Sequence, residues 1–494
     1  MTLYRTPALG TKGMAVTAHP LATFSAMNIL KKGGNAVDAA LAASAVLSVV
    51  LPNQNGLGGD LFALYYDGKE VKALNASGYA GSNLKNLSGL KNMPETGPLT
   101  ITVPGISYGW HLLSKYTTFE LNDLFSDAIN YAKNGFPLSL HLVKQIIKNY
   151  EKISKNVLLK EKFKDPYLGK IIKNEVLART LEIISEDPLS MYKGHLSEKV
   201  ANFLENAGST ITLEDLEGYS AFFDDPLWID YKGNRIYETP PNSQGVTSLL
   251  MLKYLENYDF SKMNDPEIIE KIVKAKINAF STRDKYVTDK KFMNVDAFKL
   301  LQDSNLPDGD TVYFNVIDKD GKALSCIQSI YHPFGSGVVD TETGIIYQNR
   351  GSYFSLKNKS INKIEPRKRT LHTLMAGMSI SDDDFIIFGA AGAEGQPQTH
   401  VQILINMLER KMNAQEAVEY PRFIHGRYLN DDEDSLKLER RFNYNTVQEL
   451  ISKGFKVKIL DDLDDAMGDA NVIIKNVSLV GGADPRRDSY GLGY

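Results

Sequence analysis

The stretch GDTVYFNVIDKDG, residues 309–321, decides the expected fold class of this 494-residue chain. The turn pair Gly309-Asp310 precedes residues 311–316, whose side chains alternate in the period-two pattern typical of a β-strand. Asp318–Gly321 has the composition of a hairpin turn, in which glycine adopts a positive φ. Residues 322–329 are therefore predicted to return as the second strand of a hairpin.

The hairpin brings a hydroxyl group close to Thr311. Pairing the two strands symmetrically about the turn places Thr311 opposite Gln328, and one bulge residue at the turn shifts the partner to Ser329. Because directly paired and diagonal side chains on neighbouring strands touch, we expect the Ser329 hydroxyl to lie beside Thr311.

A threonine that heads a strand directly after an exposed turn suits one catalytic mechanism. If the chain is cut between Asp310 and Thr311, Thr311 acquires a free α-amine with a pKa of about 7.7–8.0. That amine can act as the general base for the threonine's own hydroxyl, which is otherwise a weak nucleophile. The alternative is that Thr311 is simply a residue with high β-propensity.

Composition narrows the class of protein. A chain of 494 residues is long enough for two or three domains or one large multilayer domain. Charged residues make up 23% and the net charge is −4, so we expect no nucleic-acid partner. The N-terminal residues lack a signal-peptide pattern, and no apolar run approaches the ~20 residues of a membrane span. We therefore expect a soluble, cytoplasmic protein without a membrane partner, in which the single cysteine, Cys326, is a buried thiol.

Elements outside the hairpin follow from hydrophobic periodicity and from breaker residues. The predicted strands are 14–17, 61–66, 101–105, 235–237, 344–347 and 385–388. The predicted helices are 22–31, 35–51, 246–256, 265–286 and 396–410, and a cover of helices is expected over 109–205, with a solvated lysine-rich face at 152–164. Residues 290–310 are expected to form an exposed loop that leads to Thr311.

Two glycine-rich segments have different expected roles. The cluster GLGGD, residues 56–60, precedes a strand, whereas a dinucleotide-binding loop follows a strand and opens a helix; a tight backbone crossing is the better interpretation. Residues 389–395, GAAGAEG, lie between a strand and a helix, so their backbone N–H groups can bind an oxyanion. The alternative for 389–395 is an ordinary tight turn.

Eight sequence blocks together resemble the gamma-glutamyltransferase family of N-terminal-nucleophile hydrolases over nearly the whole chain. They are GGNAVDAALAA (33–43), GLGGDLF (56–62), VPG (103–105), ETPPNSQG (238–245), GDTVYFNVIDKDG (309–321), FGSGV (334–338), GQPQTHVQ (395–402) and GGADPRRD (481–488). The resemblance implies an α+β fold, a four-layer αββα sandwich made as one precursor. It also implies self-cleavage before Thr311 into a large region, 1–310, and a small region, 311–494, which stay together as one intertwined unit and form a possible homo-oligomer.

The resemblance also assigns site residues. It implies that Thr311 is the nucleophile, Ser329 the supporting hydroxyl, and Gly392-Ala393 the oxyanion-binding pair. The change to alanine in that pair should matter little, because the donor is a backbone N–H. The expected substrate contacts are Ser77, Tyr331, Arg350, Tyr353, His372 and Thr373, and the substrate is a small-molecule amide.

The pocket departs from the family pattern. The family holds the glutamyl α-carboxylate with an arginine and two serines, but no arginine stands near Ser77, and the paired serines correspond to His372-Thr373. The acid that binds the α-amine corresponds to Tyr353, with Arg350 three residues before it. The chain is therefore expected to belong to a divergent branch, and donors without a γ-glutamyl group, such as glutaryl amides or oxamate, are alternatives to γ-glutamyl amides and glutathione.

The eight histidines show no HExxH or CxxC companions, so we expect no metal and no other cofactor. His332 and His372 are the two that could lie near Thr311, and a structural role is expected for each. Two hypotheses remain open: an autoprocessed amide hydrolase or acyltransferase with an acyl-Thr311 intermediate, and a non-catalytic relative that serves as a binding or scaffold protein.

Overall fold

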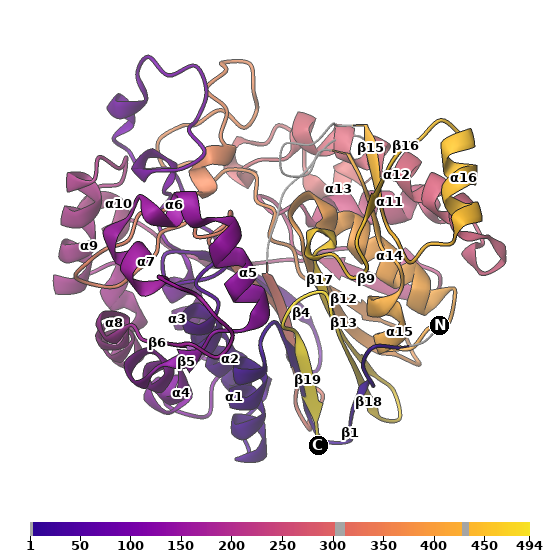
Figure 1. The fold of residues 1–494 in the computed structure, drawn as a ribbon, viewed down its shortest axis with the longest axis horizontal. Helices are drawn as coiled ribbons and strands as arrows, with labels where there is room; N and C mark the ends of the chain where they lie inside the picture. Colours follow the sequence, from indigo (N-terminus) through magenta and orange to yellow (C-terminus); the bar gives the residue numbers. More distant parts are fainter. Residues whose placement is uncertain (1–2, 302–311, 427–433) are drawn as a thin grey trace.

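Two stacked seven-stranded sheets with helices on both outer faces form the protein, an αββα sandwich (Figure 1). The computed structural model describes residues 3–301, 312–426 and 434–494. The first sheet has the order β19 (Tyr490–Gly493), β2 (Met14–Thr17), β10 (Val312–Ile317), β11 (Ala323–Ser329), β3 (Asp60–Tyr66), β4 (Val71–Ala76), β7 (Phe222–Asp224). The second has the order β1 (Ala8–Gly10), β18 (Leu479–Ala483), β17 (Asp469–Lys475), β13 (Phe385–Ala391), β12 (Gly377–Ile380), β9 (Asn234–Glu238), β8 (Leu227–Tyr231). Each sheet thus combines strands from before and after position 311.

Helices from the first half of the chain cover the first sheet, and later helices cover the second (Figure 1). The first group is α1 (Pro20–Lys31), α2 (Ala36–Val50), α3 (Ile106–Ser114), α4 (Leu121–Asn134), α5 (Leu140–Lys148), α6 (Tyr150–Ser154), α7 (Val157–Lys162), α8 (Glu175–Glu186), α9 (His195–Asn206) and α10 (Leu213–Glu217). The second is α11 (Gly245–Leu255), α12 (Asp265–Tyr286), α13 (Ala297–Leu300), α14 (Gln396–Leu408), α15 (Ala414–Glu419) and α16 (Tyr444–Ser452). Two small sheets complete the fold: β14 (Phe423–His425), β15 (Ser435–Glu439) and β16 (Lys456–Leu460), and the pair β5 (Phe136–Pro137) and β6 (Ile171–Ile172).

Alternation along the strands explains why the sheets stack. In β3, Phe62 and Leu64 face the layer between the two sheets, whereas Leu61 and Ala63 pack against the helices. Because both faces of these strands are apolar, each sheet needs cover on both sides. Helix α2 supplies that cover on the first sheet, and it is buried along its whole length, as its apolar sequence predicts.

The predicted hairpin is confirmed where the structure describes it. Val312 pairs with Gln328 and Ile317 with Ala323, around a turn in which Gly321 has a φ of 80°. This register is offset by one residue from the symmetric pairing, as the alternative with a bulge residue predicts. Thr311 itself lies outside the described residues, so its pairing with β11 stays a prediction.

Most other predicted elements are confirmed, and two strands are wrong. The prediction for α12 matches both ends, and β2, β3, β9, β13, α1, α2, α11 and α14 agree to within a few residues. Residues 101–105 are not a strand, because they contribute only scattered hydrogen bonds such as Val103 N–H to the Tyr79 carbonyl, 3.0 Å. Residues 344–347 make only isolated bridges, Ile346 with Val339 and Tyr347 with Gly58. Within 290–301, the described part of the expected loop, two short helical turns form at 290–292 and 297–300.

The glycine cluster at 56–60 is a tight backbone crossing, as predicted. A Cβ at Gly59 would lie 2.4 Å from the Ser329 carbonyl oxygen, and one at Gly58 would lie 2.3 Å from the Ile346 carbonyl oxygen. No side chain fits at such distances, so glycine is required for β3 to enter the sheet beside Ser329.

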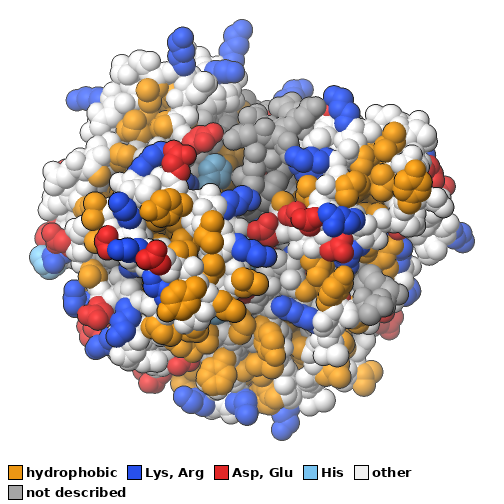
Figure 2. All heavy atoms as spheres, viewed as in Figure 1, with side chains coloured by type: hydrophobic (Ala, Val, Ile, Leu, Met, Phe, Trp, Pro, Cys, Tyr) orange, Lys and Arg blue, Asp and Glu red, His pale blue; other side chains and the backbone are white. Residues whose placement is uncertain are grey.

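Within the described residues, no helix has the length and apolar character needed to cross a membrane. Hydrophobic side chains nevertheless gather between lysines on the face over α5–α7, where the sequence predicted a solvated lysine-rich face (Figure 2).

Candidate active site

The expected site residues that the structure describes lie together at one end of the central strands. Asp310 and Thr311, the predicted cleavage site and nucleophile, lie outside the described residues, and β10 begins at Val312. The remaining ones come from the end of β11, the turn after it, the short helix η6 (Arg350–Tyr353), the segment before β12, the loop after β13 and, for Ser77, the residue after β4.

Ser329 ends β11 and is buried, paired in register with Asp60 of β3. Its Oγ accepts a hydrogen bond from the backbone N–H of Tyr331, 2.8 Å. Tyr331 has a φ of 74°, a left-handed conformation that is costly for an aromatic residue. The Ser329 hydroxyl keeps its own proton for donation, because the bond from Tyr331 uses it only as an acceptor.

Arg350 puts a buried positive charge into this site. Its side chain is inaccessible to solvent, its Nη1 donates to the Thr373 hydroxyl, 3.0 Å, and its guanidinium lies 3.8 Å from the centre of the Tyr331 ring. Stacking on an aromatic face leaves the edges of a planar guanidinium directed sideways, the geometry that suits a carboxylate.

His372 is held in one tautomer by the protein. Its Nδ1 accepts the Leu374 backbone N–H, 3.2 Å, so its Nε2 carries the proton and donates to Asp60 Oδ2, 2.9 Å. Burial, with a smaller contribution from Arg350, lowers the pKa of His372 to about 4, which keeps the ring neutral near neutral pH. Both ring nitrogens are engaged by protein groups, an arrangement that favours a structural role.

Asp60 connects the site to the two strands behind it. Besides His372, its carboxylate accepts the Gly78 backbone N–H, 2.8 Å, and the Gln348 side-chain amide, 3.1 Å. Ser77, next to Gly78, is fully buried, and its hydroxyl donates to Asn75, 2.7 Å. Ser77 is therefore part of the wall behind His372.

Gln244, from the PPNSQG turn, joins the two halves of the pocket. Its side-chain amide donates to the carbonyl oxygens of Thr373, 2.9 Å, and Ala393, 3.3 Å. Its own carbonyl accepts Arg283 Nη1 of α12. Gln244 and Arg283 are both fully buried. Gln244 thereby sets the spacing between Thr373, which binds Arg350, and the small-residue loop.

The small-residue loop makes a sharp turn into α14. Gly392 has a φ of 129° and Ala393 a φ of 53°, and residues 393–395 form the short helix η7. The Gly395 N–H closes the turn on the Gly392 carbonyl, 2.7 Å. A left-handed alanine costs about 1–2 kcal/mol relative to glycine, so the alanine of this pair carries a conformational cost. The loop lies at the N-terminus of a 13-residue helix, where the positive end of the helix dipole favours an anion.

Tyr353 and Glu394 are hydrogen-bonded to each other at this site. The Tyr353 hydroxyl donates to Glu394 Oε1, 3.2 Å, and its ring meets the Tyr331 ring edge to face with centroids 6.1 Å apart. Glu394 Oε2 lies 3.9 Å from Arg283 Nη2. Position 353 itself has a tyrosine in place of the acid expected there from the family, but the carboxylate of Glu394 lies beside it.

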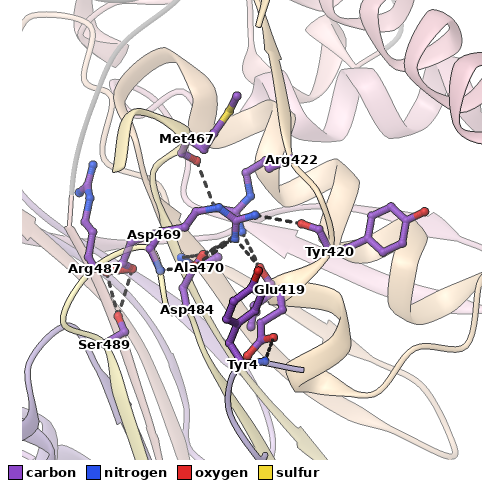
Figure 3. Close-up of polar contacts among 12 residues, drawn as sticks. Tyr4, Glu419, Tyr420, Arg422, Met467, Asp469, Ala470, Asp484, Arg487 and Ser489 are labelled. Carbon is purple, nitrogen blue, oxygen red and sulfur yellow. Dashed lines mark hydrogen bonds and ion pairs between the residues drawn. The ribbon is translucent and has the colours of Figure 1, made fainter. Parts of the chain in front are cut away.

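Arg422 and Asp484 belong to a buried cluster of charges that holds the segment next to the small-residue loop (Figure 3). Arg422 donates to Asp484 Oδ2, 2.8 Å, and to the Met467 carbonyl, 3.1 Å, while Asp484 Oδ2 also accepts the Ala470 N–H, 2.9 Å. These bonds fix residues 467–470, and a Cβ at Gly392 would lie only 3.0 Å from the Gly468 Cα. Burial lowers the pKa of Arg422 to about 10, which leaves it protonated beside Asp484 near neutral pH.

His332, the other histidine considered from the sequence, lies at the edge of the site. Its ring stacks on Tyr331, 4.1 Å between centroids, and its Nδ1 is 3.0 Å from the Asn349 side-chain amide nitrogen. Burial lowers the pKa of His332 to about 3. In the described part of the chain, no three His, Cys, Asp or Glu side chains are grouped in a way that could hold a metal ion.

The described residues of this site thus bring together a buried cation, two tyrosine rings, the Ser329 hydroxyl and a loop at a helix N-terminus. Sequence reasoning missed Asp60, Gln244, Arg283 and Glu394. Asp60 and Gln244 lie inside two of the quoted blocks, GLGGDLF and ETPPNSQG, so the blocks contained a signal although no role was assigned to them. Nothing in the local sequence separates Arg283 from the other charged residues of α12.

Known proteins match this chain over nearly its whole length. A family model described as gamma-glutamyltranspeptidase matches residues 22–306 and 299–494. The glutathione hydrolase-like YwrD proenzyme of Bacillus subtilis strain 168 is 38% identical over 98% of this chain and 99% of its own length. The oxamate amidohydrolase proenzyme of Klebsiella pneumoniae is 34% identical over 98% and 99%. Among solved structures, the cephalosporin acylase from Bacillus halodurans superposes with a TM-score of 0.93, at 31% identity, over 100% of this chain and 98% of that one.

Proposed function

Because the chain belongs to the gamma-glutamyltranspeptidase family, and is thus an enzyme of the N-terminal-nucleophile hydrolase type, we propose that it cleaves amides whose acyl group carries a free carboxylate, through a Thr311 nucleophile. γ-Glutamyl amides are the first candidate substrates. The hypothesis of a non-catalytic scaffold is set aside, because the matched relatives are named as hydrolases and acylases.

The proposed reaction begins with self-cleavage between Asp310 and Thr311. The freed α-amine of Thr311 takes the proton from its own hydroxyl, whose oxygen attacks the amide carbonyl. Backbone N–H groups at Gly392-Ala393 stabilise the oxyanion, and the Ser329 hydroxyl orients the nucleophile. The amine leaves with the proton, and water or an acceptor amine then releases the acyl group from Thr311. The relatives' designation as proenzymes supports processing of this kind.

The single observation that carries the substrate class is the buried Arg350. Its guanidinium is stacked on Tyr331 and bonded to Thr373, next to the strand that ends in Ser329. A planar guanidinium can bind a carboxylate through two parallel hydrogen bonds, so an arginine at this place favours an acyl group that carries a carboxylate.

A second observation favours γ-glutamyl donors over donors whose acyl group has no α-amine. Glu394 places a carboxylate 3.2 Å from the Tyr353 hydroxyl, so a substrate ammonium can meet an acid on that side of the pocket. Glutaryl amides and oxamate, which lack this ammonium, are the second candidates, and the oxamate amidohydrolase relative gives them weight.

Processing is tested by the mass of the purified protein under denaturing conditions. Wild type should give two fragments that begin at Met1 and Thr311, and Thr311→Ala should give one inactive chain. Uncut wild type with full amidase activity would refute the N-terminal-amine mechanism.

Activity should also rise with pH through an apparent pKa at or below the free-amine value of about 7.7–8.0, since burial disfavours the charged amine.

The substrate class is tested by kcat/KM for a γ-glutamyl anilide, a glutaryl anilide and oxamate. Arg350→Met should lower kcat/KM for all three by about tenfold or more, because each carries a carboxylate. Glu394→Gln should lower kcat/KM for the glutamyl donor alone, so the glutaryl donor serves as the internal control. Unchanged kcat/KM in Arg350→Met would refute the carboxylate assignment.

A further inference from the structure

The face formed by residues 140–173, here called the α5–β6 face, exposes an unusual concentration of large apolar side chains. Of the 23 such side chains exposed among the described residues, eight fall in this segment: Leu140, Ile147, Tyr150, Val157, Leu158, Tyr167, Leu168 and Ile171. Val157 is 75% exposed and Leu168 65% exposed. Single exposed apolar residues are ordinary, but a group of this size marks an interaction surface.

The folding of this segment does not need those exposed side chains. The same short helices bury other apolar residues, including Ile146, Ile153, Leu159 and Phe163, in the core beside the first sheet. A helix that only covers a core is apolar on one stripe and polar on the other. Here α7 places Leu159 inside and Val157 and Leu158 outside, so the outer face has an apolar character of its own.

The charge of this segment of the sequence is opposite in sign to that of the whole chain. Residues 140–173 contain nine lysines and three acids, a net charge of +6, whereas the whole chain has −4. Lys144 and Lys148 are exposed but share the cleft beside α5 with five aspartates, whereas Lys160, Lys164 and Lys173 are exposed outside that cleft. The five aspartates are Asp461, Asp462, Asp464, Asp465 and Asp488. Figure 2 shows basic side chains interspersed with hydrophobic ones on the surface over α5–α7.

The exposed apolar side chains and the lysines together favour a partner that has a negatively charged surface and an apolar interior. A symmetric pair of copies joined through this face would oppose two sets of lysines, which like-charge repulsion disfavours. The apolar side chains project from several short elements. The clefts beside α5 and α6 are lined mainly by polar residues, and the apolar cavity that Phe163 and Ile172 help to line has a volume of only about 30 Å³, so none of them offers a groove to a partner helix. A lipid surface accepts projecting apolar side chains without needing a complementary shape, and its anionic headgroups attract lysines.

We propose that the α5–β6 face binds the surface of an anionic lipid bilayer, with its apolar side chains in the interface and its lysines at the headgroups. This replaces the expectation, based on the lack of a spanning helix, that the protein has no membrane partner. The proposal is independent of the proposed reaction, since none of these residues belongs to the candidate active site.

The test is cosedimentation of the full chain with vesicles of phosphatidylcholine, with and without phosphatidylserine. Wild type should bind the vesicles that contain phosphatidylserine, and added salt should weaken binding because it screens the lysines. The variants Val157→Asp and Lys160→Glu/Lys164→Glu should each reduce binding by about tenfold or more. Val477→Asp is the matched control, because Val477 is fully exposed at the β17–β18 turn, and it should bind as wild type does.

Thermal melting and amidase activity with a soluble donor should be the same in all these variants and in wild type, which separates lost binding from lost folding. Three results would overturn the proposal: no binding to phosphatidylserine vesicles at low salt, equal loss of binding in Val477→Asp, or lipid-free self-association that Val157→Asp abolishes.

Discussion

Replacing Asp60 by asparagine should destabilise the protein and weaken the pocket although the two side chains have the same shape. The asparagine can keep the hydrogen bonds from Gly78 and Gln348 on its one oxygen. Its amide group would then face His372 Nε2, which also carries a proton, because the Leu374 N–H fixes the tautomer by donating to Nδ1. Two donors would meet at a distance now spanned by a 2.9 Å hydrogen bond.

The magnitude follows from the groups involved. Loss of a hydrogen bond to a charged group costs about 1.5–3 kcal/mol, and a buried donor left unsatisfied costs about 1–3 kcal/mol. Relief from burying a carboxylate offsets part of this sum. We expect the free energy of unfolding to fall by about 2–4 kcal/mol, a large share of the roughly 5–15 kcal/mol typical of folded proteins.

The assay is denaturant unfolding of wild type, Asp60→Asn, His372→Phe and the double variant, all in the same state of chain cleavage. The double-mutant cycle should give a coupling of about 2 kcal/mol between the two positions. Asp383→Asn, in an exposed turn, is the control and should change stability by less than about 0.5 kcal/mol. Because Thr373 follows His372 and binds Arg350, KM for a carboxylate-bearing donor should rise in Asp60→Asn. A variant as stable as wild type, with unchanged KM, would refute the account of Asp60 as the support of the pocket.

Three further outcomes are expected. His19 is buried and its pKa is lowered to about 4, so below pH 6.5 the unfolded chain binds a proton that the folded chain does not, and stability falls from pH 6.5 towards pH 4. His19→Asn keeps the helix cap and should reduce this slope, measured in melting curves, by up to about 1.4 kcal/mol per pH unit, whereas His195→Asn, at an exposed position, should leave the slope unchanged. Gln244→Leu should lower the free energy of unfolding by about 3–6 kcal/mol, because two carbonyls and one arginine lose a buried partner, and it should reduce kcat in whatever fraction still folds. Ala393→Gly should keep activity and raise thermal stability slightly, since glycine adopts the φ of 53° at lower cost; a clear loss of stability would contradict the strain assigned to this loop.

The sequence alone determined the parts of the fold that depend on neighbouring residues. The hairpin at 312–329, the glycine crossing before β3 and both ends of α12 follow from hydrophobic period, turn chemistry and helix capping, all of which act within a few residues. The two wrong strands, 101–105 and 344–347, have the composition of strands but receive no continuous partner. Whether such a segment joins a sheet depends on the backbone beside it, which its own sequence does not specify.

The walls of the candidate active site were decided by tertiary structure. Resemblance to a family located Ser329, Arg350 and the small-residue loop by position, yet it gave no account of what holds them. That support comes from pairs such as Asp60 with His372, 312 residues apart, and Gln244 with Ala393, 149 residues apart. Neither member of such a pair changes the periodicity or the turn signals of its own segment. Their contact exists only because the two sheets stack and bring the ends of their strands together, so a polar group buried at that junction finds its partner across the fold rather than along the chain.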